Sequence, residues 1–246
     1  MKDKNDQNQL VTLTLFRFEG FSNRFWAFKM MQLGHRLLKN VAGLTFYKLM
    51  GTGAGVGFKW YPNFGVYSFL GVWEDKDHFD QFKINSKFFR AYQSHFEESL
   101  TIHMQAYHSH GDWSGQNPFK SIPNAVDSSV TAVITRATIN PFRLIAFWKR
   151  VGKVGQQVKS APGHVLSLGV GEWPVVQQAT FSIWNSQSEM KAYAYSEKHH
   201  KDVITRTRKY NWYNEELFAR FVLLGSEGSW YGEDPVGKVL SNQPTA

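Results

Sequence analysis

The chain has 246 residues, of which 42% are hydrophobic and 16% are aromatic, and it contains no cysteine. The absence of cysteine excludes disulfides, thiolate-ligated haem, cysteine-bound iron–sulfur clusters and a cysteine nucleophile. The formal net charge of +8 suits nucleic acid, an anionic membrane surface or an acidic cofactor. The basic residues are scattered, and the sequence has no zinc-finger, helix-turn-helix or RNP-type pattern, so we expect no nucleic-acid partner.

The first ten residues, MKDKNDQNQL, are charged and lack the apolar stretch of a signal peptide. We expect residues 1–10 to be disordered. The longest apolar run, near residues 66–73, is too short to cross a bilayer. These features predict a cytoplasmic protein, and its basic surface suits peripheral contact with the inner membrane surface.

The chain resembles itself. Residues 11–31 and 130–151 both show a strand-like alternation, a short turn and then a helical pattern, with Arg17 matching Arg136 at a spacing of 119 residues. Three further pairs of segments match in the same order: 42–53 with 162–173, 67–82 with 179–193, and 111–115 with 228–232. In the second of these pairs, Trp73 aligns with Trp184. Chance similarity between two alternating stretches is the alternative.

Each half is predicted to run strand, helix, strand, strand, helix, strand, which is the ferredoxin-like pattern. One sheet face of such a unit is bare, so two copies are expected to close their sheets on each other. We therefore expect an α+β protein in which tandem ferredoxin-like repeats form an α/β barrel within one chain. The expected boundaries are 11–115 for the first repeat, 116–129 for the linker, 130–235 for the second repeat and 236–246 for a flexible C-terminus. A monomer is the favoured state.

Two adjacent histidines, His199 and His200, lie in a predicted helix of the second half, opposite Phe88 and Phe89 of the first half at a spacing of 111 residues. Ser186 followed by Glu189 is a capping-box pattern that predicts the start of this helix. At 100° per residue, the inward stripe contains His200 and not His199. The stripe consists of Met190, Tyr193, His200, Ile204 and Thr207.

An inward histidine is either an ordinary core residue or a ligand. The sequence shows no second metal-ligand spacing, so a zinc or non-haem iron site is not favoured. A single histidine, many aromatic residues and several arginines favour haem b with His200 as the iron ligand. Arg143, Arg206 and Arg208 are the candidate partners of the haem propionates, although an arginine in such a position is more often a surface residue than a propionate partner. Trp184 completes the predicted cofactor-binding set.

Several long segments also resemble one family. They cover residues 11–235 and include FYKLMGTGAGVGF, GVYSFLGVW and GDWSGQNPF in the first half, and TRATINPFRLIAFWKRV, LGVGEWPVVQQATFSIW and NWYNEELFARF in the second. Together they resemble the spheroidene monooxygenases, the acyclic carotenoid 2-ketolases. In the family, a histidine precedes the last of these segments, and it aligns with His200 of this chain. The residue directly before it in this chain is also a histidine, His199.

The resemblance implies a haem-dependent monooxygenase that uses O2 and a ferredoxin-type electron donor to oxidise a terminal carbon of a linear carotenoid. Two successive hydroxylations would give a ketone. Gln178 and Ser182, on the strand beside the site, are the candidate catalytic residues that would hydrogen-bond a ligand of the haem. An aromatic-rich cleft suits a long apolar substrate of this kind.

The same barrel also supports other functions. Aldoxime dehydration by a His-ligated haem is the second enzymatic reading, and it would need no reductase. A haem carrier or sensor without catalytic activity, and an oxygenase without a cofactor, are the remaining alternatives. Nothing in the residues specifies the length of the substrate.

Overall fold

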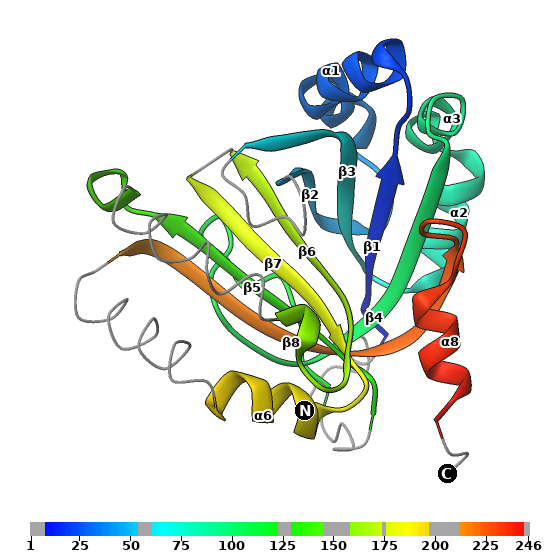
Figure 1. Cartoon of the computed structure of the whole chain (residues 1–246). Coiled ribbons are helices and arrows are strands. Elements are labelled where there is room, and N and C mark those ends of the chain that lie inside the picture. Colours follow the sequence, from blue (N-terminus) through cyan, green and yellow to red (C-terminus); the bar gives the residue numbers. More distant parts are fainter. Residues whose placement is uncertain are drawn as a thin grey trace, which may run out of the picture.

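The computed structural model describes residues 8–53, 61–122, 129–144, 158–173, 176–196 and 212–243 (Figure 1). Its centre is a closed barrel of antiparallel strands in the order β1-β3-β2-β6-β7-β5-β8-β4. The strands are β1 (Leu10–Arg17), β2 (Leu44–Gly53), β3 (Pro62–Trp73), β4 (Glu98–Gly111), β5 (Thr131–Ile139), β6 (His164–Trp173), β7 (Gln177–Trp184) and β8 (Tyr213–Gly228).

The helices of the described residues lie outside the barrel (Figure 1). They are α1 (Phe21–Leu38), α2 (Lys76–Asn85), α3 (Lys87–Gln93), α6 (Gln187–Ser196), α8 (Pro235–Ser241) and the short 3-10 helices η2 (Pro141–Arg143) and η3 (Val158–Ser160). None of the helices among the described residues is long and apolar enough to cross a membrane.

The barrel consists of two similar halves. The strand order β4-β1-β3-β2 of the first half is repeated as β8-β5-β7-β6 in the second. The long edge strands β4 and β8 pair from Leu100 to Gly111, whereas β2 and β6 pair only at Gly51↔Gly171 and Thr52↔Val170. This arrangement confirms the predicted barrel of tandem ferredoxin-like repeats within one chain.

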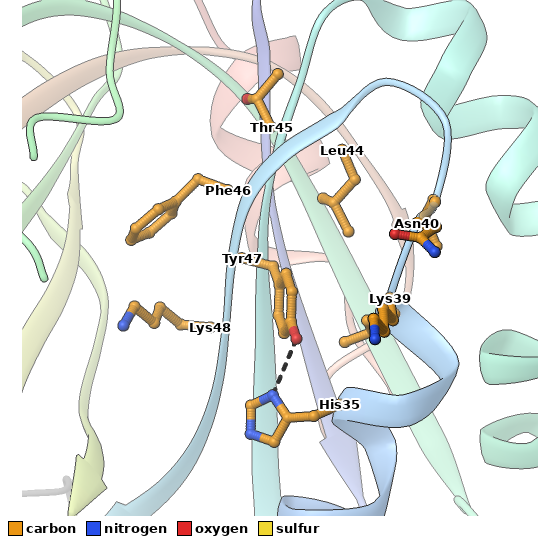
Figure 2. Close-up of a pocket in the computed structure, with 10 residues that line it drawn as sticks. His35, Lys39, Asn40, Leu44, Thr45, Phe46, Tyr47 and Lys48 are labelled. Carbon is orange, nitrogen blue, oxygen red and sulfur yellow. Dashed lines mark hydrogen bonds between the residues drawn. The ribbon is translucent and has the colours of Figure 1, made fainter.

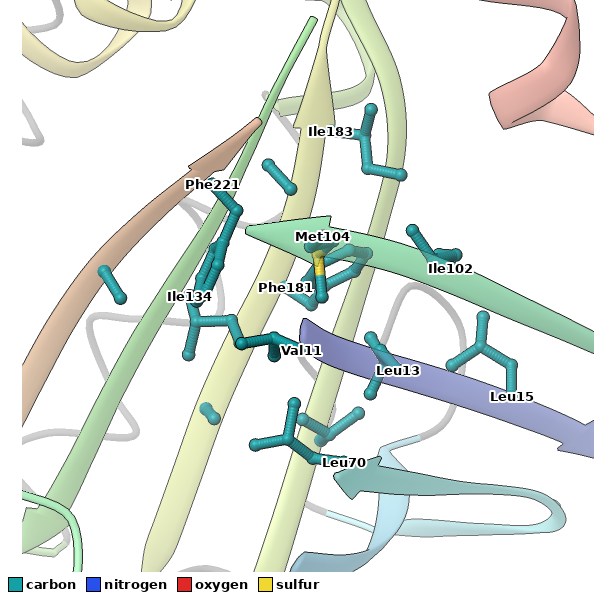
Figure 3. Close-up of a cluster of buried hydrophobic side chains, with 14 of the residues drawn as sticks. Val11, Leu13, Leu15, Leu70, Ile102, Met104, Ile134, Phe181, Ile183 and Phe221 are labelled. Carbon is teal, nitrogen blue, oxygen red and sulfur yellow. The ribbon is translucent and has the colours of Figure 1, made fainter. Parts of the chain in front are cut away.

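Alternating side chains fill the inside of the barrel. Each strand sends every second residue inward, as expected for a sheet with one face in a core. Figure 3 shows Leu13, Ile102 and Met104 of the first half packed against Ile134, Phe181 and Phe221 of the second. All six are at most 3% exposed, so burial of these side chains holds the two halves together.

The same turn closes β4 and β8. Gly111 and Gly228, which end these strands, have φ angles of 81° and 91°. A Cβ atom on Gly111 would collide with the backbone oxygen of Glu216, and one on Gly228 with that of Ser99. Only glycine fits either position, because it tolerates positive φ and has no Cβ.

The match between β1 and β5 differs from its prediction. The closing glycines Gly111 and Gly228 place β4 and β8 at a spacing of 117 residues. The pairing of β1 with β4 and of β5 with β8 then gives a spacing of 121 residues between β1 and β5, rather than the predicted 119. Arg136 therefore aligns with Leu15, and Arg17 aligns with Thr138. Each arginine nevertheless forms an ion pair with a glutamate, Arg17 with Glu98 and Arg136 with Glu215. The side chains are equivalent, although their strands are shifted by two residues.

The ends of the two repeats are more ordered than expected. Residues 235–241, which include most of the segment that we expected to be flexible, form α8. Asp234 accepts hydrogen bonds from the backbone N–H groups of Val236 and Gly237, which caps this helix. In the predicted linker, Phe119 is only 5% exposed and belongs to the barrel core. The remaining boundaries of the repeats stay predictions.

Candidate functional site

The outer faces of the two half-sheets differ in composition. In the first half, Phe16, Tyr67 and Phe69 point outward and are at most 5% exposed. The helix α3 covers them, with the ring of Tyr92 4.7 Å from that of Phe16 and the ring of Phe88 5.1 Å from that of Phe69. Aromatic rings thus fill the space between sheet and helix, and Tyr67 has its pKa raised to about 12 by burial.

In the second half, small and polar residues occupy the equivalent positions. By the strand register, Ala137, Gln178 and Thr180 replace Phe16, Tyr67 and Phe69. Gln178 and Thr180 remain partly accessible.

Thr135 lies between Thr180 on β7 and Phe218 on β8, in the middle of the sheet, and is nevertheless exposed. We call the surface formed by Thr135, Gln178, Thr180 and Phe218 the open face. A mid-sheet residue that is exposed indicates space for a ligand above the sheet.

A row of polar groups crosses the sheet next to the open face. Cross-strand pairing places Ser167, Ser182, Val133, Arg220 and His108 side by side on β6, β7, β5, β8 and β4. The hydroxyl of Ser182 accepts a hydrogen bond of 3.0 Å from the indole N–H of Trp184. Its own hydrogen is therefore left to donate to a further acceptor. The neighbouring Ser167 Oγ is buried and has no partner within the described part of the chain.

Arg220 brings a positive charge to this row. Its Nε is buried without a hydrogen-bond partner among the described residues, and its guanidinium lies 5.1 Å from the ring centre of Phe218. Burial, followed by the charges of Arg220 and His110, lowers the pKa of His108. This side of the row is therefore suited to an electron-rich or anionic group.

Trp184 connects the polar row to α6. It is 2% exposed, and its ring lies 5.0 Å from that of Tyr193 on the helix. The predicted N-cap is present, because the hydroxyl of Ser186 accepts from the backbone N–H of Glu189; the same hydroxyl donates to the Glu189 carboxylate. The predicted inward residue Met190 is buried beside Trp184, as the helical stripe requires.

The predicted site residues divide into two groups. Gln178, Ser182 and Trp184 lie on alternate positions of β7 and share its outer face. His199, His200, Arg206 and Arg208 lie outside the described residues, as does the side chain of Arg143 at the end of η2. Their roles stay predictions. Sequence reasoning missed Thr135, Ser167 and Arg220, although the alternation in the β8 segment already placed Phe218 and Arg220 on one face.

A pocket of about 570 Å³ lies in the first half, between the end of α1 and β2 (Figure 2). In Figure 2, Tyr47 points toward α1, where its hydroxyl is 3.1 Å from Nδ1 of His35, while Phe46 and Lys48 point to the other side of β2. His35, Lys39 and Asn40 make its lining polar. It contains none of the predicted site residues and does not suit a long apolar ligand, so we place the candidate site on the open face.

The residues of the open face fit the predicted haem. Ala, Gln and Thr stand where the first half has three aromatic side chains, which is the reduction in side-chain size that a flat macrocycle above the sheet would require, and Phe218 adds an apolar contact surface. Ser182 and Arg220 supply polar groups on the sheet side. Among the described residues, no three His, Asp or Glu side chains come together as a metal-binding group.

Comparison with known proteins gives relatives over nearly the whole chain. The chain is 36% identical over 242 residues to the spheroidene monooxygenase of Rhodobacter capsulatus, covering 96% of this chain and 99% of that protein. It is 35% identical over 238 residues to the one from Cereibacter sphaeroides, covering 96% and 74%. No family model matches the chain.

Among solved structures, an aldoxime dehydratase in complex with butyraldoxime has a TM-score of 0.62 to this chain at 11% identity. The match covers 97% of this chain and 87% of the dehydratase. At this level of identity, the likeness concerns the fold alone.

Proposed function

Because the chain belongs to the spheroidene monooxygenase family, we propose that it is a haem-dependent monooxygenase acting on an acyclic, carotenoid-like substrate. Each turnover would insert one atom of O2 into a C–H bond and reduce the other atom to water, using two electrons and two protons. A ferredoxin-type donor would supply the electrons. Two successive hydroxylations at C2, near the end of the chain, followed by loss of water from the resulting geminal diol, would give the ketone of a 2-ketolase.

The contrast between the two outer faces supports this proposal. The first half fills the space under its helices with Phe16, Tyr67 and Phe69, whereas the second half has smaller side chains at the equivalent positions, of which Gln178 and Thr180 stay partly accessible. The internal repeat also aligns His200 with Phe89, whose ring lies 6.3 Å from that of Phe16. An imidazole in place of Phe89 would therefore be directed at the space above Ala137, the counterpart of Phe16.

In this proposal, His200 binds the haem iron, Arg143, Arg206 and Arg208 pair with the propionates, and Trp184 packs against the macrocycle. When bound, haem supplies the activation of O2, which amino-acid side chains do not provide. Ser182 is oriented by the Trp184 indole so that its hydroxyl can donate to a bound ligand. Gln178 offers an amide N–H from the same strand.

The absorption spectrum of protein expressed with sufficient haem tests the cofactor and its ligand. We expect a Soret band in the wild type and in His199→Ala, and its loss or a strong shift in His200→Ala. A Soret band that is lost only in His199→Ala would identify His199, rather than His200, as the iron ligand. No Soret band in the haem-replete wild type would contradict the haem proposal.

Turnover separates the proposed reaction from aldoxime dehydration. With an acyclic carotenoid, a ferredoxin-type donor and O2, we expect hydroxylated and ketolated products, and none when the donor is omitted. Dehydration of an aldoxime by the reduced protein, without any external donor during turnover and without activity on the carotenoid, would favour the dehydratase reading.

A further inference from the structure

The helix α1 has an unusual outer face. Its inner face packs on the first half-sheet through Ala27, Met30, Gly34 and Leu38, which are buried. On the other side, Phe21, Phe25 and Phe28 follow one another at helical spacing and are 86%, 52% and 54% exposed. Amphipathic surface helices normally carry polar residues on this side, so three exposed phenylalanines require an explanation.

The exposed rings belong to one surface. Phe21 stacks on Phe25 with ring centres 6.2 Å apart, and Phe28 meets Phe64 of β3 at 5.9 Å. Phe64 is itself 51% exposed, and Leu33, one turn further along α1, is 41% exposed. We call Phe21, Phe25, Phe28, Leu33 and Phe64 the aromatic face. Figure 1 shows α1 on the outside of the first half-sheet.

Basic residues accompany the aromatic face. Arg24, Lys29 and Arg36 are exposed on α1, and the helix contains no aspartate or glutamate. Nζ of Lys29 lies 5.0 Å from the ring centre of Phe25. Exposed aromatic rings next to cations, on a helix that itself contains no acidic residue, match the properties of helices that lie in the interface of an anionic bilayer.

We propose that the aromatic face docks this protein on the surface of a bilayer that contains anionic lipid. This inference rests on the proposed function, because a carotenoid-like substrate is dissolved in the bilayer and the enzyme must withdraw it from there. Phe21, Phe25 and Phe28 would enter the region between headgroups and acyl chains, while Arg24, Lys29 and Arg36 contact the phosphates.

Charge argues against a second copy of the chain as the partner. In a symmetric contact, the same patch faces itself, so Arg24 and Lys29 would oppose their own counterparts across the interface. The helix has no acidic residue that could neutralise them, and Glu19, just before the helix, is already paired with Arg17. Like charges of this kind disfavour self-association, whereas anionic lipid headgroups compensate them.

Flotation of the haem-loaded full chain with vesicles tests the proposal. Vesicles of zwitterionic lipid alone would be compared with vesicles that also contain an anionic lipid. We expect binding to the anionic vesicles, weaker binding at high salt, and a loss on the order of tenfold or more for Phe21→Ser/Phe25→Ser/Phe28→Ser. Arg24→Gln/Lys29→Gln should weaken binding by about fivefold for each charge removed.

Ile84→Ser is the matched control, because Ile84 is 66% exposed on α2, away from α1. It should bind like the wild type. Absence of flotation by the wild type, or equal binding by all variants, would overturn the proposal. A wild-type dimer in analytical ultracentrifugation that the three phenylalanine substitutions dissociate would assign the face to self-association instead. Lipid binding requires neither haem nor turnover, so failure here is distinct from failure of the proposed function.

Discussion

Glu98 and Glu215 occupy equivalent positions in the two halves, and each binds the turn that follows the long edge strand of the other half. Glu98 accepts hydrogen bonds from the backbone N–H groups of Tyr231 and Gly232, and Glu215 accepts one from Gly115. Glu98 and Glu215 differ by 117 in residue number, and so do the turn glycines Gly115 and Gly232. Two reciprocal carboxylate contacts thus fasten each half to its partner at opposite ends of the barrel.

The ionised state of Glu98 is expected to stabilise the fold. Burial opposes ionisation, but hydrogen bonds from Gly232, Ser229 and Arg17 outweigh it and lower the pKa from 4.5 to about 2. Because the folded-state pKa is depressed, this stabilisation is complete above the unfolded pKa and is lost as the pH falls toward 2. Glu98→Gln should lower the free energy of unfolding by ~2 kcal/mol at neutral pH.

Urea denaturation at pH 7 and at pH 3 measures this effect. The wild type should lose stability between these values, and Glu98→Gln should lose less, so that the gap between the two proteins narrows in acid. Glu233→Gln is a suitable control, because its carboxylate is 65% exposed in its ion pair with Lys238. An unchanged gap at both pH values would show that Glu98 acts through packing alone.

The duplication was visible in the sequence because Trp73, Trp184 and the two glycine-flanked turns keep their spacing. The register of β5 was not, since sliding a strand by two residues leaves the same side chains on the same face. The prediction that Arg17 and Arg136 are counterparts is therefore correct for their ion pairs, but their positions along β1 and β5 differ by two residues. The sequence did not predict the helix α8, because this short helix is held by packing on the barrel core, where Val236 is fully buried.

The candidate site was only partly predictable for a similar reason. Ser182 and Trp184 are close in sequence, so one strand pattern was enough to place them on a common face. Arg220 and Thr135 join them only through the pairing of β7, β5 and β8, which a single sequence does not reveal. Exposure in the middle of a sheet, as at Thr135, is a property of the folded chain that the strand pattern does not carry.

Exchanging residues between the two outer faces should separate ligand binding from stability. Thr180→Phe places the first-half residue into the open face, so we expect haem occupancy to fall by on the order of tenfold or more, with stability within ~1 kcal/mol of the wild type. The reverse change, Phe69→Thr, empties a buried site and should destabilise the fold by about 3 to 5 kcal/mol.

Haem titration and urea denaturation of both variants provide the two readouts. The first variant should lose haem and keep its fold, and the second should lose stability while any remaining folded protein binds haem. Full haem occupancy in Thr180→Phe would show that the open face does not hold the cofactor.

The Trp184–Ser182 hydrogen bond should be important for the fold as well as for the site. Ser182→Ala removes the acceptor of a buried indole N–H and should cost about 1 to 3 kcal/mol. In the first half, the indole of Trp73 donates to Thr12 over 2.9 Å, so Thr12→Val is the matched change. Denaturation should show similar losses for both variants, whereas only Ser182→Ala should alter the haem spectrum. Equal spectra for the two would remove Ser182 from the site.

Arg220 provides the most direct test of the sheet side of the site. If its guanidinium faces the ligand of a bound haem, it should stabilise a small anion there by charge-assisted hydrogen bonding. Arg220→Gln should then weaken fluoride binding to the ferric protein on the order of tenfold, and Arg220→Lys should recover part of the loss. Arg90→Gln, which removes an exposed arginine from α3, controls for net charge. Titrations followed in the visible spectrum measure the affinities independently of turnover. If Arg220→Gln and Arg90→Gln bind fluoride equally well, Arg220 lies too far from the haem ligand to act on it, and its buried Nε must serve a different partner.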